Sequence, residues 1–289
     1  MNNNQRKRGS EIEYLVCKCL AKMGYKPQRD GYTAKRIRAI KCAANARLET
    51  KICQALVCIL GPAKEKKKSK PPLFSLMRDT HGSSTSATRS TSDVVIHSEP
   101  PINISIKHNN QSLKHQKASN LWSQMRMCPS RKRRFIEAYE KITSAWYAAH
   151  CAAGPSPSAN ASTYSEVSQV AKQTLYNDIN SLILKNLVSA PQKDLRGYLD
   201  FILDLPTANK YIIKCDKDRA AVRVMQLCVP GNAPITGIKR VGNFIEIQLG
   251  GPDLVVRMRL HTCKNRLTPK LALKYDTQLK GGLVDVVSL

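Results

Sequence analysis

The sequence is poor in acidic and in aromatic residues. Its 21 Asp and Glu residues stand against 47 Lys and Arg residues, which gives a formal net charge of +26, and aromatic residues make up 6% of the chain. So few aromatic side chains do not indicate a stacking platform for single-stranded nucleic acid. The excess of positive charge attracts polyanions, and nucleic acid is therefore the first partner to consider.

Long apolar runs are also missing. The longest one, around residues 52–60, has about half the length that a membrane span requires, and the polar N-terminal residues are not followed by the apolar core of a signal peptide. We therefore expect a cytoplasmic protein that does not act at a membrane.

The signatures of several enzyme classes are absent from the sequence. The ten cysteines include no C-x-x-C pair and the six histidines form no H-x-x-x-H pattern, so a structural zinc site is not expected. There is no GxxxxGK[ST] phosphate loop, no dinucleotide-binding fingerprint and no G-x-S-x-G nucleophile elbow. These absences disfavour kinases, dehydrogenases, zinc enzymes and serine hydrolases.

The segment 93–109 carries the most specific pattern. Isoleucines at 102, 104 and 106 alternate with Asn103, Ser105 and Lys107, which predicts a strand that buries the isoleucines and directs Lys107 to the opposite face. A lysine on such a strand, after an acid such as Asp93, is typical of metal-dependent nucleases, in which the carboxylate binds the cation and the lysine lies near the phosphate. Ser105 stands where this pattern usually has an acid. The alternative interpretation is a solvated strand face.

Apolar periodicity predicts the remaining elements and a mixed α/β (α+β) fold, with a central sheet flanked by helices. Helices are expected over 9–23, 34–60, 131–151 and 164–187, and strands over 211–214, 221–225, 244–249 and 254–261. In the first helix, Ser10 and Glu13 fit a capping box, which gives Glu13 a structural interpretation.

The strand at 254–261 has a basic face. Val256, Met258 and Leu260 alternate with Arg257, Arg259 and His261. Arginine donates bidentate hydrogen bonds to guanine or phosphate, so this row indicates a DNA-facing strand. A solvated edge strand with outward charges is the alternative.

Several of these segments, in the same order, resemble the HaeIII-type restriction endonucleases, a branch of the PD-(D/E)xK nucleases. The resemblance rests on Ser-Ile-Lys-His-Asn at 105–109 with Lys-His at 114–115, on Gly-Ser-Glu-Ile-Glu-Tyr at 9–14, and on three C-terminal stretches, namely the glycines at 250–251, Arg-Met-Arg-Leu-His at 257–261 and Leu-Ala-Leu-Lys-Tyr-Asp at 271–276. The middle of the chain, about 122–205, matches only loosely.

The resemblance implies roles for particular residues. Asp93 would bind Mg²⁺, Lys107 would be the catalytic lysine, and Glu13 would supply the carboxylate that is missing at Ser105. The residues expected next to the scissile DNA strand or in contact with DNA are His108, Asn109, Lys114, His115, Arg257, Arg259 and His261.

The implied function is that of a type II restriction endonuclease, which hydrolyses double-stranded DNA at a short palindrome, GGCC by resemblance. The expected organisation is a nuclease core over 1–205 and a β-rich DNA-contacting part over 206–289, either separate or continuous with the core. A homodimer on DNA and a cognate DNA methyltransferase as genetic partner are also expected. A structure-specific or repair nuclease and a non-catalytic DNA-binding protein are the alternatives.

Overall fold

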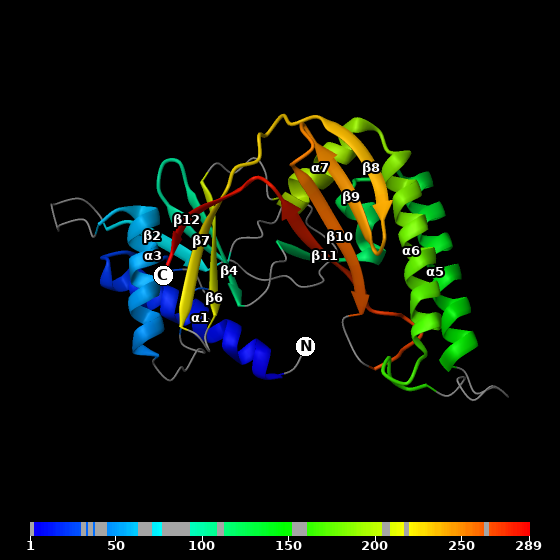
Figure 1. Ribbon diagram of the computed structural model, residues 1–289, viewed down its shortest axis with the longest axis horizontal. Helices are drawn as coiled ribbons and strands as arrows, with labels where there is room; N and C mark the ends of the chain where they lie inside the picture. Colours follow the sequence, from blue (N-terminus) through cyan, green and yellow to red (C-terminus); the bar gives the residue numbers. More distant parts are fainter. Residues whose placement is uncertain are drawn as a thin grey trace.

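A computed structural model of the chain describes residues 3–29, 33, 37, 45–62, 71–76, 93–108, 113–151, 161–203, 209–216, 220–262 and 266–289. The strands form two sheets, one mixed and one antiparallel, and each sheet carries helices on one face (Figure 1). The expectation of a mixed α/β fold with a central sheet flanked by helices is confirmed at this level.

The mixed sheet has seven strands in the order β1-β2-β3-β4-β6-β7-β12. β4 is antiparallel to β3 and parallel to β6, and β6 is antiparallel to β7. The strands are β1 (Lys26–Pro27), β2 (Leu73–Leu76), β3 (Val94–His97), β4 (Ile102–His108), β6 (Lys210–Asp216), β7 (Ala221–Leu227) and β12 (Leu283–Ser288).

Helices α1 (Asn3–Lys22) and α3 (Ala46–Leu60) cover one face of the mixed sheet. Their apolar side chains recur at three- and four-residue spacing and pack into one core with alternate residues of the strands, such as Ile104 and Ile213. The α3 helix begins where the Asn45 side chain accepts a hydrogen bond from the Leu48 amide, and it ends at Gly61, whose φ of 79° suits glycine.

The second sheet is antiparallel and has five strands in the order β5-β11-β10-β9-β8. The turn at residues 250–253 joins β9 and β10 as an antiparallel hairpin. The strands are β5 (Lys114–Lys117), β8 (Ile235–Val241), β9 (Phe244–Leu249), β10 (Val255–Thr262) and β11 (Leu273–Lys280).

The helices between β5 and β6 cover one face of the five-stranded sheet (Figure 1). They are η1 (Ala118–Asn120), α4 (Leu121–Gln124), α5 (Pro129–Cys151), α6 (Gln169–Val188) and α7 (Gln192–Leu203). The buried Tyr275 hydroxyl on β11 donates to Asn180 on α6 at 2.7 Å, and the Tyr198 hydroxyl on α7 contacts Met258 of β10. The buried core under this sheet also includes Ile212 of β6, so the two units share apolar contacts.

The C-terminal strands belong to both sheets. After β11 the chain passes through Gly281 and Gly282 and returns to the mixed sheet as β12, beside β7 (Figure 1). Both glycines have positive φ, and a Cβ on Gly281 would lie 2.1 Å from the Asp253 carbonyl oxygen, so this crossing requires glycine. Since β6, β7 and β12 complete the sheet that β1–β4 begin, the part after residue 206 is continuous with the part before it.

Three sequence-based expectations are corrected by the structure. The first helix begins at Asn3, so Ser10 lies inside it and is not its N-cap. The helix expected from residue 164 begins at Gln169, because the Glu166 carboxylate accepts the amides of Ser162 and Thr163 in a turn and Ser168 is the cap. β10 is not an edge strand, since it pairs with both β9 and β11.

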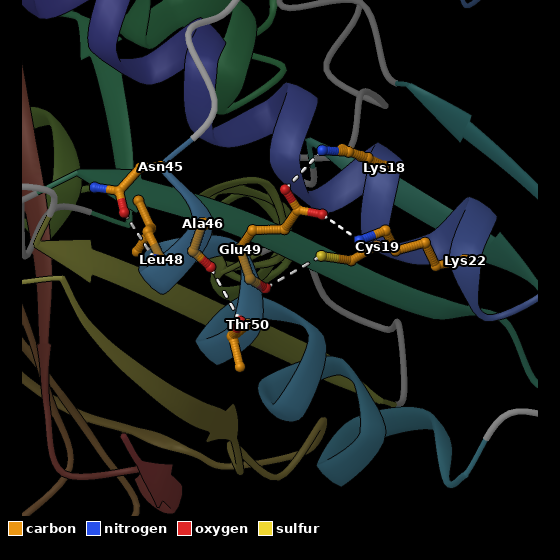
Figure 2. A network of polar contacts seen from close by, with 8 residues as sticks. All are labelled: Lys18, Cys19, Lys22, Asn45, Ala46, Leu48, Glu49 and Thr50. Atoms are coloured by element: carbon orange, nitrogen blue, oxygen red, sulfur yellow. Dashed lines mark hydrogen bonds and ion pairs between the residues drawn. The ribbon is translucent and has the colours of Figure 1, made fainter.

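A buried acid joins α1 to α3 (Figure 2). Glu49 of α3 is 6% exposed, and its carboxylate accepts hydrogen bonds from Lys18 at 2.7 Å and from Lys22 at 2.5 Å, both on α1. These two hydrogen bonds hold the pKa of Glu49 below its usual value of 4.5. Because the ionised form is the one that is bound, this contribution to stability is present above the unfolded-state pKa and is lost as the pH falls through the lower folded-state pKa.

We predict that Glu49→Gln lowers the free energy of unfolding by about 1–2 kcal/mol at pH 7, since both lysines lose a charged partner but remain partly in water. Urea unfolding of the variant and the wild type measures this. The difference should shrink as the pH falls below 4, and Glu137→Gln, which removes an exposed ion pair on α5, should change stability little. Equal effects of the two substitutions would contradict the assignment.

Candidate active site and nucleic-acid interface

Asp93 lies immediately before β3 and contacts the neighbouring strand β4. Its amide donates to the Ile104 carbonyl at 2.8 Å, and its carboxylate Oδ2 accepts the Ile106 amide at 2.5 Å. The carboxylate is therefore fixed at the backbone of β4 between Ser105 and Lys107. The hydrogen bond also gives Asp93 a structural role, because β4 continues past the end of β3 and the Ile106 amide has no strand partner on that side.

Lys107 lies on the face of β4 opposite the isoleucines, as the alternation predicted. Ile104 is fully buried against α1 and α3, whereas Lys107 is half-buried on the other face. Ser105, on the same face as Lys107, is 1% exposed. The predicted acid and lysine are thus brought together at one end of two adjacent strands, with a buried serine between them.

Glu13 comes from the other side of the sheet. It is half-buried on α1, next to the buried Ile12 and Val16, and α1 packs on the face to which Ile104 points. Its neighbour Glu11 is buried as well. Glu13 is not part of a helix cap, because α1 begins at Asn3, so that interpretation is removed. Its assignment as a metal ligand stays a prediction.

In this region, few of the described acids could hold a cation. In the part of the chain that the structure describes, no three His, Cys, Asp or Glu side chains lie close enough together to hold a metal ion. Mg²⁺ commonly takes one or two protein carboxylates and completes its octahedron with water and substrate phosphate. The Asp93 carboxylate, held by the Ile106 amide, is one such group, whereas Glu13 lies on α1 at the opposite, isoleucine face of the sheet.

A pocket between α1 and α3 is separate from this site. It is lined by Lys18, Lys22 and Glu49 of the interhelix network in Figure 2, together with Cys53 and Leu289. These helices cover the isoleucine face of the sheet, so the pocket does not open toward Lys107. The predicted nuclease chemistry does not involve it.

The predicted alternation of the basic row on β10 is confirmed, but its cations are paired with acids. Val256, Met258 and Leu260 are buried, and Arg257, Arg259 and His261 lie on the opposite face. Acids on the two adjacent strands pair with them, since Arg257 is 2.8 Å from Glu246 on β9, and Arg259 and His261 lie 3.6 and 3.0 Å from Asp276 on β11. Arg257 also lies over the Phe244 ring. Part of the positive charge of the row is therefore neutralised within the sheet.

The whole uncovered face of the five-stranded sheet is nevertheless basic. Strand register places further lysines of β5, β8 and β11 on the face that carries the arginines, opposite the helices. We call this surface the basic sheet face. Its cations are Lys117, Lys239, Arg257, Arg259, Lys274 and Lys280, and its acids are Glu246 and Asp276.

The segment after Lys107 divides between the two sheets. His108 is the last residue of β4, Asn109 lies outside the described residues, and Lys114 and His115 begin β5, which pairs with β11. The two halves of the sequence pattern 105–115 are therefore on different sheets.

Sequence reasoning missed the lysines that topology adds. Lys214 of β6 lies beside Lys107 because β4 and β6 pair in parallel, and Lys239 joins the basic sheet face through β8. The run Tyr-Ile-Ile-Lys at 211–214 predicts a strand but contains no signal that names its partner.

We predict that Asp93→Ala lowers the free energy of unfolding by about 1–3 kcal/mol, because the Ile106 amide loses its acceptor. Asp93→Asn keeps an acceptor oxygen at the same place and should lose less than half as much. Thermal or urea unfolding of both variants tests this. Equal destabilisation by the two substitutions would show that the charge, and not the hydrogen bond, supports β4.

Comparisons with protein-family models, with curated protein sequences and with solved structures found no match to this chain. Among the helices in the described ranges, none is long and apolar enough to cross a membrane.

Proposed function

We propose that the chain is a Mg²⁺-dependent endonuclease of double-stranded DNA, with the specificity of a type II restriction enzyme for a short palindrome. The observation that carries the proposal is the pairing of β3 with β4, which holds the Asp93 carboxylate on the backbone beside Lys107. The resemblance of the segments around 9–14, 105–115 and 250–276 to HaeIII-type enzymes supports it, and suggests GGCC as the target.

The roles follow from charge and position. Bound at Asp93 and the phosphate, Mg²⁺ would lower the pKa of a coordinated water and offset the charge that develops on the phosphate. Lys107 would hold the attacking water beside the phosphate, and the Asp93 carboxylate, which the Ile106 amide fixes, would hold the cation. Glu13, on the isoleucine side of the sheet, is the second acid that the resemblance implies.

The basic sheet face suits the DNA backbone. Its six cations exceed its two acids, and its ion pairs can exchange for phosphate contacts that release counterions. Arg259 is the most exposed of the three β10 residues. Such contacts position a duplex, while the palindrome itself must be read by a few base-edge contacts. Hydrolysis of both strands of a palindrome would require two copies of the site, hence a homodimer on DNA, and a cellular methyltransferase that protects the same sequence.

A non-catalytic DNA-binding protein is the second candidate. Two observations favour it: the Asp93 carboxylate already has a structural partner in the Ile106 amide, and no cluster of three possible metal ligands occurs within the described ranges. In this candidate function, the basic sheet face binds DNA and no hydrolysis takes place at Asp93 and Lys107.

The first test is cleavage of phage DNA by the purified protein, with Mg²⁺ and with EDTA. We expect discrete Mg²⁺-dependent fragments whose sequenced ends give the target site. Lys107→Ala and Asp93→Asn should each reduce cleavage by a factor of about 100 or more while Lys107→Ala keeps most of its DNA affinity, because both act on the transition state. A Lys107→Ala protein that cuts normally would refute the site. A smear would favour a structure-directed or repair nuclease. DNA that stays intact but shifts on a native gel would favour the non-catalytic binding protein.

A second prediction concerns the basic sheet face. Replacing Lys274 and Lys280 of β11 together by Gln should weaken DNA binding and reduce the slope of log K against log salt by about 1.8, if each lysine contacts one phosphate. Titrations of a labelled duplex at several salt concentrations measure this slope. The matched control is Lys141→Gln with Lys193→Gln, which removes the same charge from exposed positions on α5 and α7. Similar slopes for both double variants would place the DNA elsewhere.

A further inference from the structure

Two lysines lie side by side on adjacent strands of the mixed sheet. β4 and β6 pair in parallel with Lys107 opposite Lys214, and neighbouring strands are separated by about 4.8 Å. The buried residues Ile104 and Ile213 point to the helix-covered face, so both lysines, which lie at the alternate positions, point to the other face.

A third cation extends the row. Arg223 of β7 is the register partner of Lys214, which places three cations across three adjacent strands. Arg223 has its own counterion, because its Nε and Nη2 donate to the two carboxylate oxygens of Asp285 on β12 at 2.6 and 2.5 Å. The exposed ion pair with Asp285 therefore balances the charge at one end of the row.

The other two cations have no such counterion. In the part of the chain that the structure describes, neither Lys107 nor Lys214 forms an ion pair or a side-chain hydrogen bond, although both are half-buried. Like charges directly opposite each other on adjacent strands repel. Lys210, the first residue of β6, differs from Lys107 and Lys214, since it is buried and its Nζ donates to the Leu203 carbonyl.

We propose that Lys107 and Lys214 together form a phosphate-binding site, in which one phosphate group bridges the two ammonium groups. Under the proposed function, on which the identity of the natural ligand rests, that group is the DNA phosphate to be cleaved. Asp93 is held at the same end of β4, by its hydrogen bond to the Ile106 amide next to Lys107. Lys214 then binds a non-bridging oxygen, and Lys107 is left to act on the attacking water as well.

Such a site differs from a structural lysine in its effect on stability. Lys214→Gln removes one of two repelling charges, so without phosphate the variant should melt at the same temperature as the wild type or higher. In inorganic phosphate, at ionic strength matched with chloride, the wild type should gain more in melting temperature than Lys214→Gln, because only the wild type keeps the pair. Lys141→Gln, an exposed lysine on α5, is the control and should gain as the wild type does.

Cleavage is the second readout. At saturating DNA, Lys214→Gln should slow single-turnover hydrolysis by about 10- to 100-fold, as expected when one donor to a developing charge is lost. Lys214→Arg, which keeps the charge, should recover part of the rate, and Lys141→Gln should cut at the wild-type rate.

The outcomes separate the two proposals. A wild type that does not cut DNA but loses its phosphate-induced stabilisation in Lys214→Gln would end the nuclease proposal and leave the phosphate site standing. A wild type that cuts, with a Lys214→Gln variant that cuts equally fast and is stabilised equally by phosphate, would overturn the site. A variant that melts well below the wild type without phosphate would also overturn it, because Lys214 would then be structural.

Discussion

The register of β4 between its two neighbours is the constraint on which the site depends. Pairing with β3 brings Asp93 to the Ile106 amide, and pairing with β6 brings Lys214 to Lys107. A slip of one residue would turn Lys107 into the core and Ile106 outward, which the apolar face of α1 and α3 opposes. Burial of a few isoleucines thus fixes the positions of the charged groups on the opposite face.

The scarcity of acids gives those that are present specific partners. Glu49 joins α1 to α3, Glu246 and Asp276 pair with arginines across the five-stranded sheet, and Asp285 pairs with Arg223. With 21 acids and 47 basic residues, pairing inside the fold cannot balance the charge. The cations that remain include aligned lysines on the sheet faces opposite the helices, where strand register sets their spacing.

Apolar periodicity in the sequence was sufficient to predict the helices and strands that bury a continuous apolar face. The helix ending at Cys151 and the strands β6, β7, β9 and β10 were predicted from it. The short strands β1, β2 and β5 were not, because two to four residues carry too little pattern. β8 and β12 were missed as well. Their residues are only half-buried or exposed, so alternation is weak.

For the candidate site, the sequence was sufficient to predict which face of a single strand a residue occupies. It was not sufficient to predict which strands pair. The alternation from Ile102 to Lys107 placed Lys107 correctly on its face, and the order of residues placed Asp93 near it. The Lys107 and Lys214 pair and the counterions of Arg257 and Arg259 depend on which strands lie side by side, and local propensity does not encode that choice. Ser10 illustrates the opposite error, since a local capping pattern was overridden by a helix that begins earlier.

The order of strands also bears on when the site exists during synthesis. Residues 109–209, with β5 and helices α4–α7, lie between β4 and its parallel partner β6. Closing so long a segment is slow relative to local folding, because its entropy is lost before the strands pair. In a nascent chain that has not yet emerged past residue 210, β4 with Lys107 has β3, which follows Asp93, as its one neighbour. Lys107 and Lys214 therefore come to lie side by side only after the whole intervening segment has been synthesised.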